Sequence, residues 1–252
     1  MDRNRVRIGD TYHQWTKYRR DEMGGGGLDW ANQPAAYKKF PASLKRISIS
    51  SFNHQGGQAL WEAIGRRRSL RDFSHDPITF EELSVLIWAT QGITTRAWGV
   101  DLRTVPSAGA LYPIETYVVV NRIQGISAGI YHYSVKEAQL VLIREGSFGR
   151  ELSQAALGQE MLGEAACAFV WTAMVERSKW KYRERAYRYI YMDAGHVGQN
   201  LYLAATGLNL GCCTVGAFFD DEIDHLIGIE GTGEITIYLG AVGHIRQRSS
   251  GY

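Results

Sequence analysis

The chain has 252 residues, a length at which many mixed helix and strand folds form a single domain with a full core. Hydrophobic residues make up 45% and charged residues 21%, which is the balance of a folded globular protein rather than a disordered one. Lys and Arg number 28 against 26 Asp and Glu, so the charge gives no reason to expect nucleic acid or an anionic membrane as a partner.

The three cysteines, Cys167, Cys212 and Cys213, show neither C-x-x-C nor paired zinc spacing. This usage favours a reducing compartment. The N-terminus lacks the apolar region of a signal peptide, and no segment reaches 18 uninterrupted apolar residues. We therefore expect a cytoplasmic protein.

The first 56 residues are polar and glycine-rich, and they predict a partly flexible arm. A short helix is expected over residues 11–22, before the break at the glycines 24–27. The remaining residues, 57–252, are expected to form one domain.

Two helices open this domain. Apolar residues from Ala59 to Ile64 have helical spacing. A second helix follows Pro77, where Thr79 is the expected N-cap and Glu82 completes a capping box.

Strands are expected to dominate the middle of the chain. Residues 116–120 are β-branched, and two further short strands are indicated over 129–134 and 139–143. A helix over 147–157 precedes the most apolar segment, 165–175, whose continuous hydrophobicity is typical of a strand covered on both faces.

The longest periodic segment, residues 183–207, predicts a buried helix with Gly207 as its C′ residue. After it come the small-residue segment 211–219, a short helix over 220–227 and a strand over 235–239. Helices and strands mix without a strict βαβ repeat, so an α+β sandwich is favoured over a doubly wound sheet.

Residues 66–71 place four arginines and the Ser69 hydroxyl together at the end of a helix. The planar arginine fork fits phosphate oxygens, so such a cluster forms an anion site when its members converge. The alternative is a solvated basic helix end, which is favourable beside the helix dipole.

Two other segments are rich in small residues. In 106–113, bounded by prolines, they permit a flat ligand to approach the backbone, and in 211–218 backbone N–H groups can face a polar ring edge. Taken singly, each segment is more typical of a turn or a tight connection than of a ligand site. No nucleotide-binding glycine motif, G-x-S-x-G elbow or H-E-x-x-H sequence occurs, and a lone His196 is more typical of a core or interface position.

In this order and spacing, the segments resemble the nitroreductase-like flavoenzyme superfamily, and within it the SagB-type dehydrogenase branch. The resemblance covers about residues 57–245. The motifs that carry it are R-R-S-L-R-D-F at 67–73, P-S-A-G-A-L-Y-P-I-E at 106–115, K-Y-R-E-R-A-Y-R-Y at 181–189 and D-A-G-H-V-G-Q-N-L at 193–201. The segment Y-H-Q-W-T-K at 12–17 is also similar to a motif that opens many members of this branch.

The resemblance implies an α+β three-layer sandwich, with a central mixed or antiparallel sheet between helices, that binds FMN at the interface of a homodimer. The resemblance implies three sets of contacts to the cofactor. The phosphate and ribityl chain would be bound by Arg67, Ser69 and Arg71. The flavin would be covered from the second subunit by Pro106, Ser107, Ala108 and Ala110, and the ring would lie against Val215, Gly216 and Ala217. Ala110 stands where nitroreductases often have a polar residue. The Gly216 N–H is the candidate to face the flavin N5 and to stabilise negative charge there.

Arg246 and Arg248 follow the last predicted strand. They are either further phosphate ligands or solvated charges of the tail. The apolar helix over 183–207 offers a two-fold contact between subunits, a core role within one subunit, or both.

Lys181 and Tyr182 match a pair that the azoline oxidases of this branch link to removal of a proton from the substrate. A lysine desolvated beside a flavin is a suitable base, with the tyrosine as relay. The alternative is two solvated residues in a basic helix start.

The expected function is therefore FMN-dependent hydride transfer of the SagB type, oxidising azolines in a ribosomal peptide or a small molecule, with a cyclodehydratase as a possible partner protein. The alternatives are an NAD(P)H-dependent reductase of nitro compounds or quinones, and a non-catalytic scaffold in a peptide-modifying complex.

Overall fold

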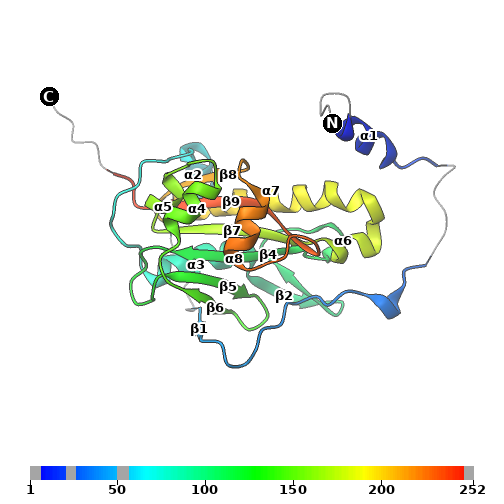
Figure 1. Ribbon diagram of the computed structural model, residues 1–252, viewed down its shortest axis with the longest axis horizontal. Coiled ribbons are helices and arrows are strands. Elements are labelled where there is room, and N and C mark those ends of the chain that lie inside the picture. Colours follow the sequence, from blue (N-terminus) through cyan, green and yellow to red (C-terminus); the bar gives the residue numbers. More distant parts are fainter. Residues whose placement is uncertain (1–6, 21–26, 50–56, 247–252) are drawn as a thin grey trace.

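The computed structural model describes residues 7–20, 27–49 and 57–246 (Figure 1). Its central sheet has seven strands in the order β1-β6-β5-β4-β7-β9-β8, and every neighbouring pair is antiparallel. The strands are β1 (Arg46–Ser48), β4 (Ile114–Val120), β5 (Gly129–Ser134), β6 (Gln139–Glu145), β7 (Cys167–Met174), β8 (Gly211–Val215) and β9 (Glu234–Gly243).

Helices cover both faces of the sheet, so the expected three-layer α+β sandwich is confirmed (Figure 1). One layer consists of α3 (Phe80–Gln91) and α7 (Ala186–Gly207), against which α2 (Leu60–Arg66) and α6 (Val175–Tyr182) pack. The other layer consists of α4 (Gly149–Ala155), α5 (Met161–Glu164) and α8 (Asp220–Ile227).

Strand β7 shows why the sheet is buried on both sides. Its alternate residues Phe169 and Trp171 pack into the core beneath α3 and α7, while Ala168 and Val170 pack beneath α4 and α8. All four are fully buried. The two-residue period of a strand therefore sends apolar side chains into both cores, as the continuous hydrophobicity predicted.

The capping box of α3 is confirmed. The Thr79 N–H donates to Glu82 Oε2 at 2.7 Å, and the Glu82 N–H donates to Thr79 Oγ1 at 3.1 Å. Two N–H groups that the first helical turn leaves without intrahelical partners are thus satisfied.

Several local expectations were wrong. The first helix, α1 (Ile8–Trp15), begins before residue 11 and ends at Trp15, whereas a helix over 11–22 was expected; residues 21 and 22 lie outside the described residues. A hairpin of β2 (Ile93–Ala97) and β3 (Val100–Arg103) was not foreseen, because its residues are largely exposed and lack a clear alternation.

The end of the long helix also differs. Gly207 is its last helical residue rather than C′, and the left-handed conformation falls on Asn209, with φ +57°. Residues 211–215 then form strand β8 instead of a loop, because backbone partners lie on both of its edges. Strand β9 pairs with one edge, and Ser69 forms a β-bridge to Cys212 on the other.

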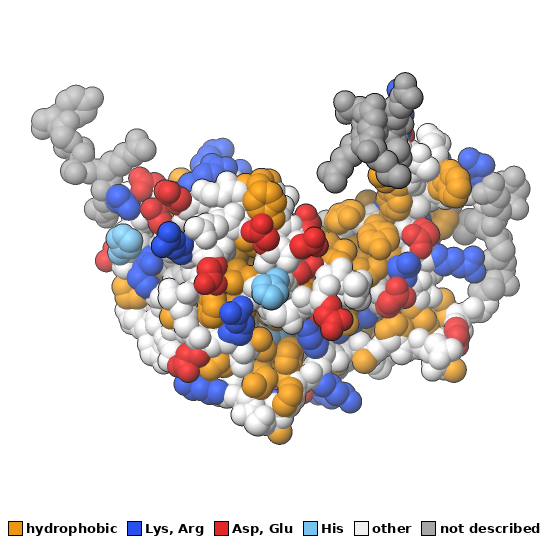
Figure 2. All heavy atoms as spheres, viewed as in Figure 1, with side chains coloured by type: hydrophobic (Ala, Val, Ile, Leu, Met, Phe, Trp, Pro, Cys, Tyr) orange, Lys and Arg blue, Asp and Glu red, His pale blue; other side chains and the backbone are white. Residues whose placement is uncertain are grey.

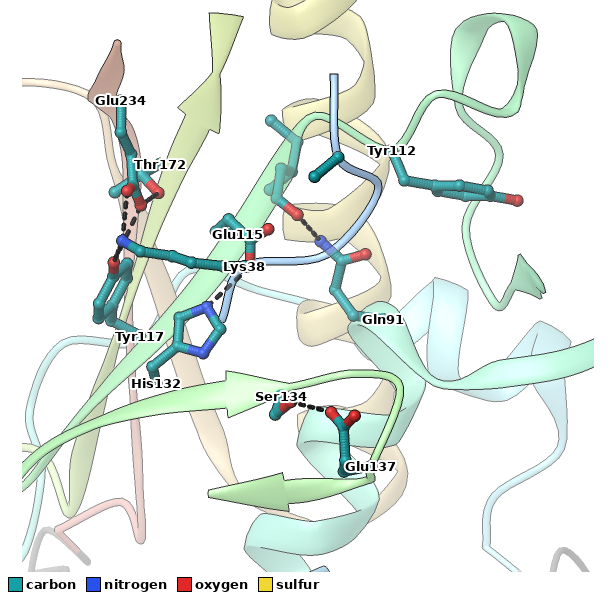
Figure 3. A network of polar contacts seen from close by, with 12 residues as sticks. Lys38, Gln91, Tyr112, Glu115, Tyr117, His132, Ser134, Glu137, Thr172 and Glu234 are labelled. Carbon is teal, nitrogen blue, oxygen red and sulfur yellow. Dashed lines mark hydrogen bonds and ion pairs between the residues drawn. The ribbon is translucent and has the colours of Figure 1, made fainter. Parts of the chain in front are cut away.

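The segment before residue 57 contributes to the sheet. Strand β1 pairs with β6, and Lys38 contacts both Tyr117 and Glu234 on the sheet (Figure 3). Glu234 also accepts a 2.7 Å hydrogen bond from Thr172. The domain boundary at residue 56 stays a prediction, but residues 46–48 extend the sheet on the N-terminal side of it.

Within the described part of the chain, no helix is long and apolar enough to cross a membrane. All three cysteines are buried free thiols. Burial raises the pKa of Cys167 to about 12. The cytoplasmic location stays a prediction.

Candidate functional site

The segment 106–113 is held to α7 by one buried carboxylate. Ser107 Oγ donates a 2.6 Å hydrogen bond to Asp193 Oδ2, and the Ala108 N–H donates to Asp193 Oδ1 at 3.2 Å. Ser107 Oγ also accepts a hydrogen bond from the Tyr112 N–H at 2.9 Å. Burial raises the pKa of Asp193, although these two hydrogen bonds oppose the increase. Motifs 106–115 and 193–201 are therefore joined by direct contacts.

The loop at this point has an unusual backbone. Gly109, Ala110 and Tyr112 all have positive φ, at +64°, +54° and +46°. This region is disfavoured for side chains other than glycine, and such conformations gather at functional sites where the surrounding structure enforces them. Here the hydrogen bonds of Ser107 supply that enforcement.

The candidate catalytic pair packs against the same loop. A Cβ atom added at Gly109 would lie 2.6 Å from the Tyr182 hydroxyl and 3.0 Å from Lys181 Nζ, so both side chains lie directly against this glycine. Lys181 is exposed and Tyr182 is half-buried, with its ring centroid 4.5 Å from that of Tyr189. Burial, and the nearby charges of Tyr189 and Asp193, raise the pKa of Tyr182.

A second group of polar residues lies farther along α7. Ser69 Oγ is 2.9 Å from the Tyr202 hydroxyl, which accepts a 3.0 Å hydrogen bond from the Thr214 N–H. Thr214 Oγ1 lies 2.5 Å from the Tyr238 hydroxyl. The chain of hydroxyls thus runs from the arginine motif across α7 to the edge of the sheet at β8 and β9.

Three guanidinium groups beside this chain have no carboxylate partner among the described residues. Arg67 lies over the Tyr202 ring at 5.2 Å from its centroid, while Arg68 and Arg71 are exposed. Arg66, in contrast, pairs with Glu62. Uncompensated arginines next to a serine hydroxyl fit the phosphate of an FMN molecule.

The end of β8 leaves room for a flat group. Val215 is buried, whereas Gly216 and Ala217 are exposed, and a Cβ atom added at Gly216 would meet nothing closer than Tyr238 at 4.0 Å. At 1.5 Å per residue, Asp193 and Tyr202 lie about 13 Å apart along α7. The loop and the arginine motif thus contact the same helix about two and a half turns apart.

The remaining predicted residues lie apart from this arrangement or outside the structure. Pro106 is exposed and begins the loop. Arg246 makes an exposed ion pair with Asp72 at 3.3 Å and a hydrogen bond to the Phe73 carbonyl oxygen at 3.2 Å, so it lies beside the arginine motif but is already paired. Arg248 lies outside the described residues.

Sequence reasoning missed four residues of the site: Asp193, Tyr202, Thr214 and Tyr238. Asp193 had a detectable pattern, since it is a carboxylate on the buried stripe of α7 with Ile190 and Val197. The other three are common hydroxyl residues, and only their contacts single them out.

The motif at residues 12–17 contacts the segment that follows the candidate pair. The Arg188 N–H donates to the Tyr12 hydroxyl at 3.1 Å, and Arg188 Nε donates to Thr16 Oγ1 at 2.8 Å. Arg185 donates to the Thr16 carbonyl oxygen at 2.5 Å, and its guanidinium lies over the Tyr18 ring. Two motifs far apart in sequence therefore form one contact region.

Among the residues that the structure describes, no group of three or more His, Cys, Asp or Glu side chains is placed to hold a metal ion. The side chains that the structure brings together at the site carry hydroxyl, carboxylate, amine and guanidinium groups.

Comparison with known proteins gives relatives of two kinds. The chain is 40% identical over 171 residues to MJ1384 of Methanocaldococcus jannaschii, a protein assigned to the nitroreductases, and the match covers 68% of this chain and 85% of that one. It is 42% identical over 127 residues to the trifolitoxin-processing protein TfxB of Rhizobium leguminosarum, covering 48% of this chain but 34% of TfxB. It is 34% identical to the microcin B17-processing protein McbC of Escherichia coli, of which 42% is covered. This chain therefore spans less than half the length of either processing protein.

Solved structures agree on the fold. A protein of Anabaena variabilis assigned to the nitroreductases has a TM-score of 0.75 and 33% identity, with 94% of this chain and 47% of that chain covered. Likeness at low identity, which shows the fold alone, extends to the E. coli microcin synthetase McbBCD complex with truncated pro-MccB17 bound, at a TM-score of 0.64 and 20% identity over 95% of this chain and 92% of that chain. It also extends to a protein of Desulfovibrio desulfuricans in complex with FMN. That structure has a TM-score of 0.52 and 18% identity, with 77% of this chain and 91% of that chain covered.

The family model described as "Nitroreductase family" matches residues 64–244, which is most of the chain. The similarity to two peptide-processing proteins agrees with the SagB-type branch of this family. The matched region includes all four motifs and both groups of site residues. The chain belongs to the nitroreductase family.

Proposed function

We propose that this protein is an FMN-dependent oxidoreductase that transfers two electrons between a substrate and its flavin. The observation that carries the proposal is the arrangement along α7. At one end the loop of Ser107 and Gly109 meets Lys181 and Tyr182, and at the other end unpaired arginines lie beside Ser69. A structural neighbour with FMN bound supports the choice of cofactor.

The residues that would hold FMN are those with free donors or open space. Arg67, Ser69 and Arg71 would bind the phosphate and ribityl chain, and the exposed backbone of Gly216 and Ala217 would lie against the ring. When bound, FMN would supply the two-electron chemistry by accepting a hydride at N5. The roles of Val215, whose side chain is buried, and of the paired Arg246 are secondary in this proposal.

A homodimer would complete the site. Tyr191 and Met192 on α7 are 56% and 57% exposed, and Figure 2 shows hydrophobic side chains gathered over the end of α7 at which α6 joins it. A second copy packed on this face would shield apolar surface that a single chain leaves in water. In that arrangement Pro106, Ser107, Ala108 and Ala110 of one copy would cover the flavin of the other.

Lys181 and Tyr182 would perform the proton chemistry. Oxidation of an azoline ring removes a proton from one carbon and a hydride from its neighbour, so a base must face the ring. Lys181 Nζ would accept that proton, and the Tyr182 hydroxyl, held beside Gly109, would orient the substrate or relay the proton. Packing of a second copy would shield the exposed lysine from water.

The substrate we propose is an azoline in a ribosomally made peptide, with a cyclodehydratase as the partner that forms the ring. Similarity to two peptide-processing proteins supports this choice. Reduction of nitro compounds or quinones with NAD(P)H is the second candidate, and the similarity to MJ1384, which covers more of both chains, favours it. The third candidate, a scaffold without catalysis, predicts a colourless protein.

The absorption spectrum of the purified protein tests the cofactor. We expect bound FMN, and we expect Arg67→Ala and Arg71→Ala each to lower the flavin content, while Arg150→Ala on α4 serves as a control with the same change. Equal flavin content in all three variants would refute the phosphate assignment. Lys181→Ala should retain FMN but slow azoline oxidation. Lys179→Ala is the control, because Lys179 lies on the same helix and pairs with Glu184. Turnover of a nitroarene with NADH, without azoline oxidation, would select the second candidate.

A further inference from the structure

A pocket behind the flavin-covering loop contains a buried arginine without a carboxylate partner. The pocket has a volume of about 290 Å³, and its walls include Tyr37, Asp101, Arg103, Tyr112 and Arg177. It lies between the β2 and β3 hairpin, the loop at Ala110 and the N-terminal segment near Tyr37. Tyr37, Asp101, Arg103 and Arg177 were not singled out from the sequence, whereas Ala110 and Tyr112 belong to the motif at 106–115.

Arg103 is only 8% exposed, yet most of its hydrogen-bonding capacity is unused. Its Nη1 donates to the neutral Gln91 Oε1 at 2.9 Å, and Gln91 in turn donates to the Ile114 carbonyl oxygen at 3.0 Å (Figure 3). Its Nε is buried without any acceptor. No hydrogen bond from Nη2 to a described residue is present either. A buried guanidinium in this condition is unfavourable unless an anion completes its shell.

The charges around the pocket do not balance. Arg177, which is 4% exposed, pairs with Glu115 at 2.6 Å, and Glu115 also contacts His132 Nε2 at 2.7 Å. Asp101 pairs with Arg96 at 2.8 Å and accepts a hydrogen bond from the Tyr37 hydroxyl at 2.5 Å. Asp101 on the pocket wall and Glu115 behind Arg177 are thus already paired. The charge of Glu115 also acts on Arg103, but neither carboxylate contacts Arg103 directly, and the three arginines leave one excess positive charge.

The shape of the free donors favours one class of anion. Nε and Nη2 lie along one edge of the planar guanidinium group, and the donors of this edge match the two oxygens of a carboxylate. The flat face of Arg103 lies 4.6 Å from the Tyr112 ring centroid and 5.8 Å from that of Tyr37. Walls of this kind suit a planar group better than a tetrahedral phosphate or sulfate.

We propose that this pocket binds a carboxylate, the group carried by a peptide end, an acidic side chain or a small organic acid. Its volume admits a group of about the size of one amino acid. Ala110, on its wall, is the neighbour of Gly109, which contacts Lys181 and Tyr182. A carboxylate held by Arg103 would therefore place the rest of its molecule beside the candidate catalytic pair. Only this last step, that the ligand is the substrate, rests on the proposed function.

Equilibrium binding to the purified full chain tests the pocket without turnover. The probes are N-acetylglycine and its neutral amide, N-acetylglycinamide, with binding followed by saturation-transfer NMR and calorimetry. We expect the acid to bind at least about tenfold more tightly than the amide, because the charge-assisted pair is lost in the amide. Equal binding of the two probes, or no binding of the acid, would overturn the proposal.

Two variants locate the binding. Arg103→Gln should weaken binding of N-acetylglycine at least about tenfold, while the matched change Arg150→Gln on α4 should leave it unchanged. Ala36→Phe keeps Arg103 but fills the pocket from an exposed position on its wall, and it should cause the same loss. If Arg103→Gln does not fold, the Ala36→Phe result decides, and undiminished binding there refutes the site.

The outcomes separate this proposal from the redox function. Acid binding to a protein without flavin would support the pocket and remove the oxidoreductase proposal. An active protein that contains flavin but binds the acid and the amide equally would support the oxidoreductase proposal and refute the carboxylate pocket.

Discussion

Ser107 Oγ donates a 2.6 Å hydrogen bond to Asp193 Oδ2, and this contact joins the loop of residues 106–113 to the long helix α7. Because Asp193 also accepts a hydrogen bond from the Ala108 N–H, one buried carboxylate fixes two consecutive residues of the loop. The loop in turn fixes Gly109 against Lys181 and Tyr182. The position of Lys181 and Tyr182 against the loop therefore depends on Asp193, which forms no hydrogen bond with either of them.

We expect Asp193→Ala to destabilise the fold by about 1–3 kcal/mol, since it leaves two partly buried donors without an acceptor. Asp193→Asn should cost less, because its amide oxygen still accepts from the Ala108 N–H. Urea unfolding at pH 7 measures both. Equal losses in the two variants would show that the charge, not the hydrogen bond to Ala108, holds the loop.

The pH dependence of Asp193 has a definite sign. Because burial raises its pKa in the fold above the ordinary 3.8, the stability that it contributes is complete below that value and falls as the pH rises through the raised pKa. Asp193→Asn removes this dependence. We therefore expect the stability of the Asn variant relative to wild type to improve from acid toward neutral pH.

Glu115 predicts the opposite dependence. Burial alone would raise its pKa, but the hydrogen bond and charge of His132 and the charges of Arg177 and Arg103 lower it from 4.5 to about 2. Its contribution to stability is thus present above pH 4.5 and is lost between about pH 4.5 and pH 2.

Glu115→Gln should cost about 3 kcal/mol at pH 7, because it leaves the buried Arg177 without its carboxylate. The difference from wild type should shrink as the pH falls toward 2. Urea titrations at several pH values check this, and Glu137→Gln, an exposed change on the turn before β6, is the control. A difference that stays constant with pH would contradict the assignment.

Much of the fold followed from local patterns. The capping box at Thr79 and the continuous hydrophobicity of β7 both express short-range rules, and the structure agrees with them. Strand β8 did not follow, because its glycine and cysteines become a strand only through pairing with β9 and Ser69. The site shows the same division: the motifs marked Ser69 and Lys181, whereas Asp193 and Tyr202 acquire their roles from partners distant in sequence.

The contact between Thr16 and Arg188 should hold α1 to the rest of the fold. An eight-residue helix is too short to be stable alone, so α1 depends on these hydrogen bonds. We expect Tyr12→Phe combined with Thr16→Val to speed hydrogen exchange and proteolysis in residues 8–17 while the remainder of the chain unfolds at the same urea concentration. The exposed His13→Ala is the control. Unchanged exchange in the double variant would show that other contacts hold the helix.

A substitution at Gly109 tests the contact between the loop and the candidate catalytic pair, Lys181 and Tyr182. An alanine there would have its Cβ atom 2.6 Å from the Tyr182 hydroxyl, so Tyr182 and Lys181 must move. Gly158 is the matched control, since it has a similar positive φ of +75° against +64° but no heavy atom within 4 Å of an added Cβ. Both changes to alanine should cost about 1 kcal/mol of stability through the left-handed backbone. Only Gly109→Ala should also reduce azoline oxidation or nitroarene reduction, by about tenfold or more, in steady-state assays at equal flavin content. If both variants retain full turnover, the contact of Gly109 with Lys181 and Tyr182 has no part in the reaction.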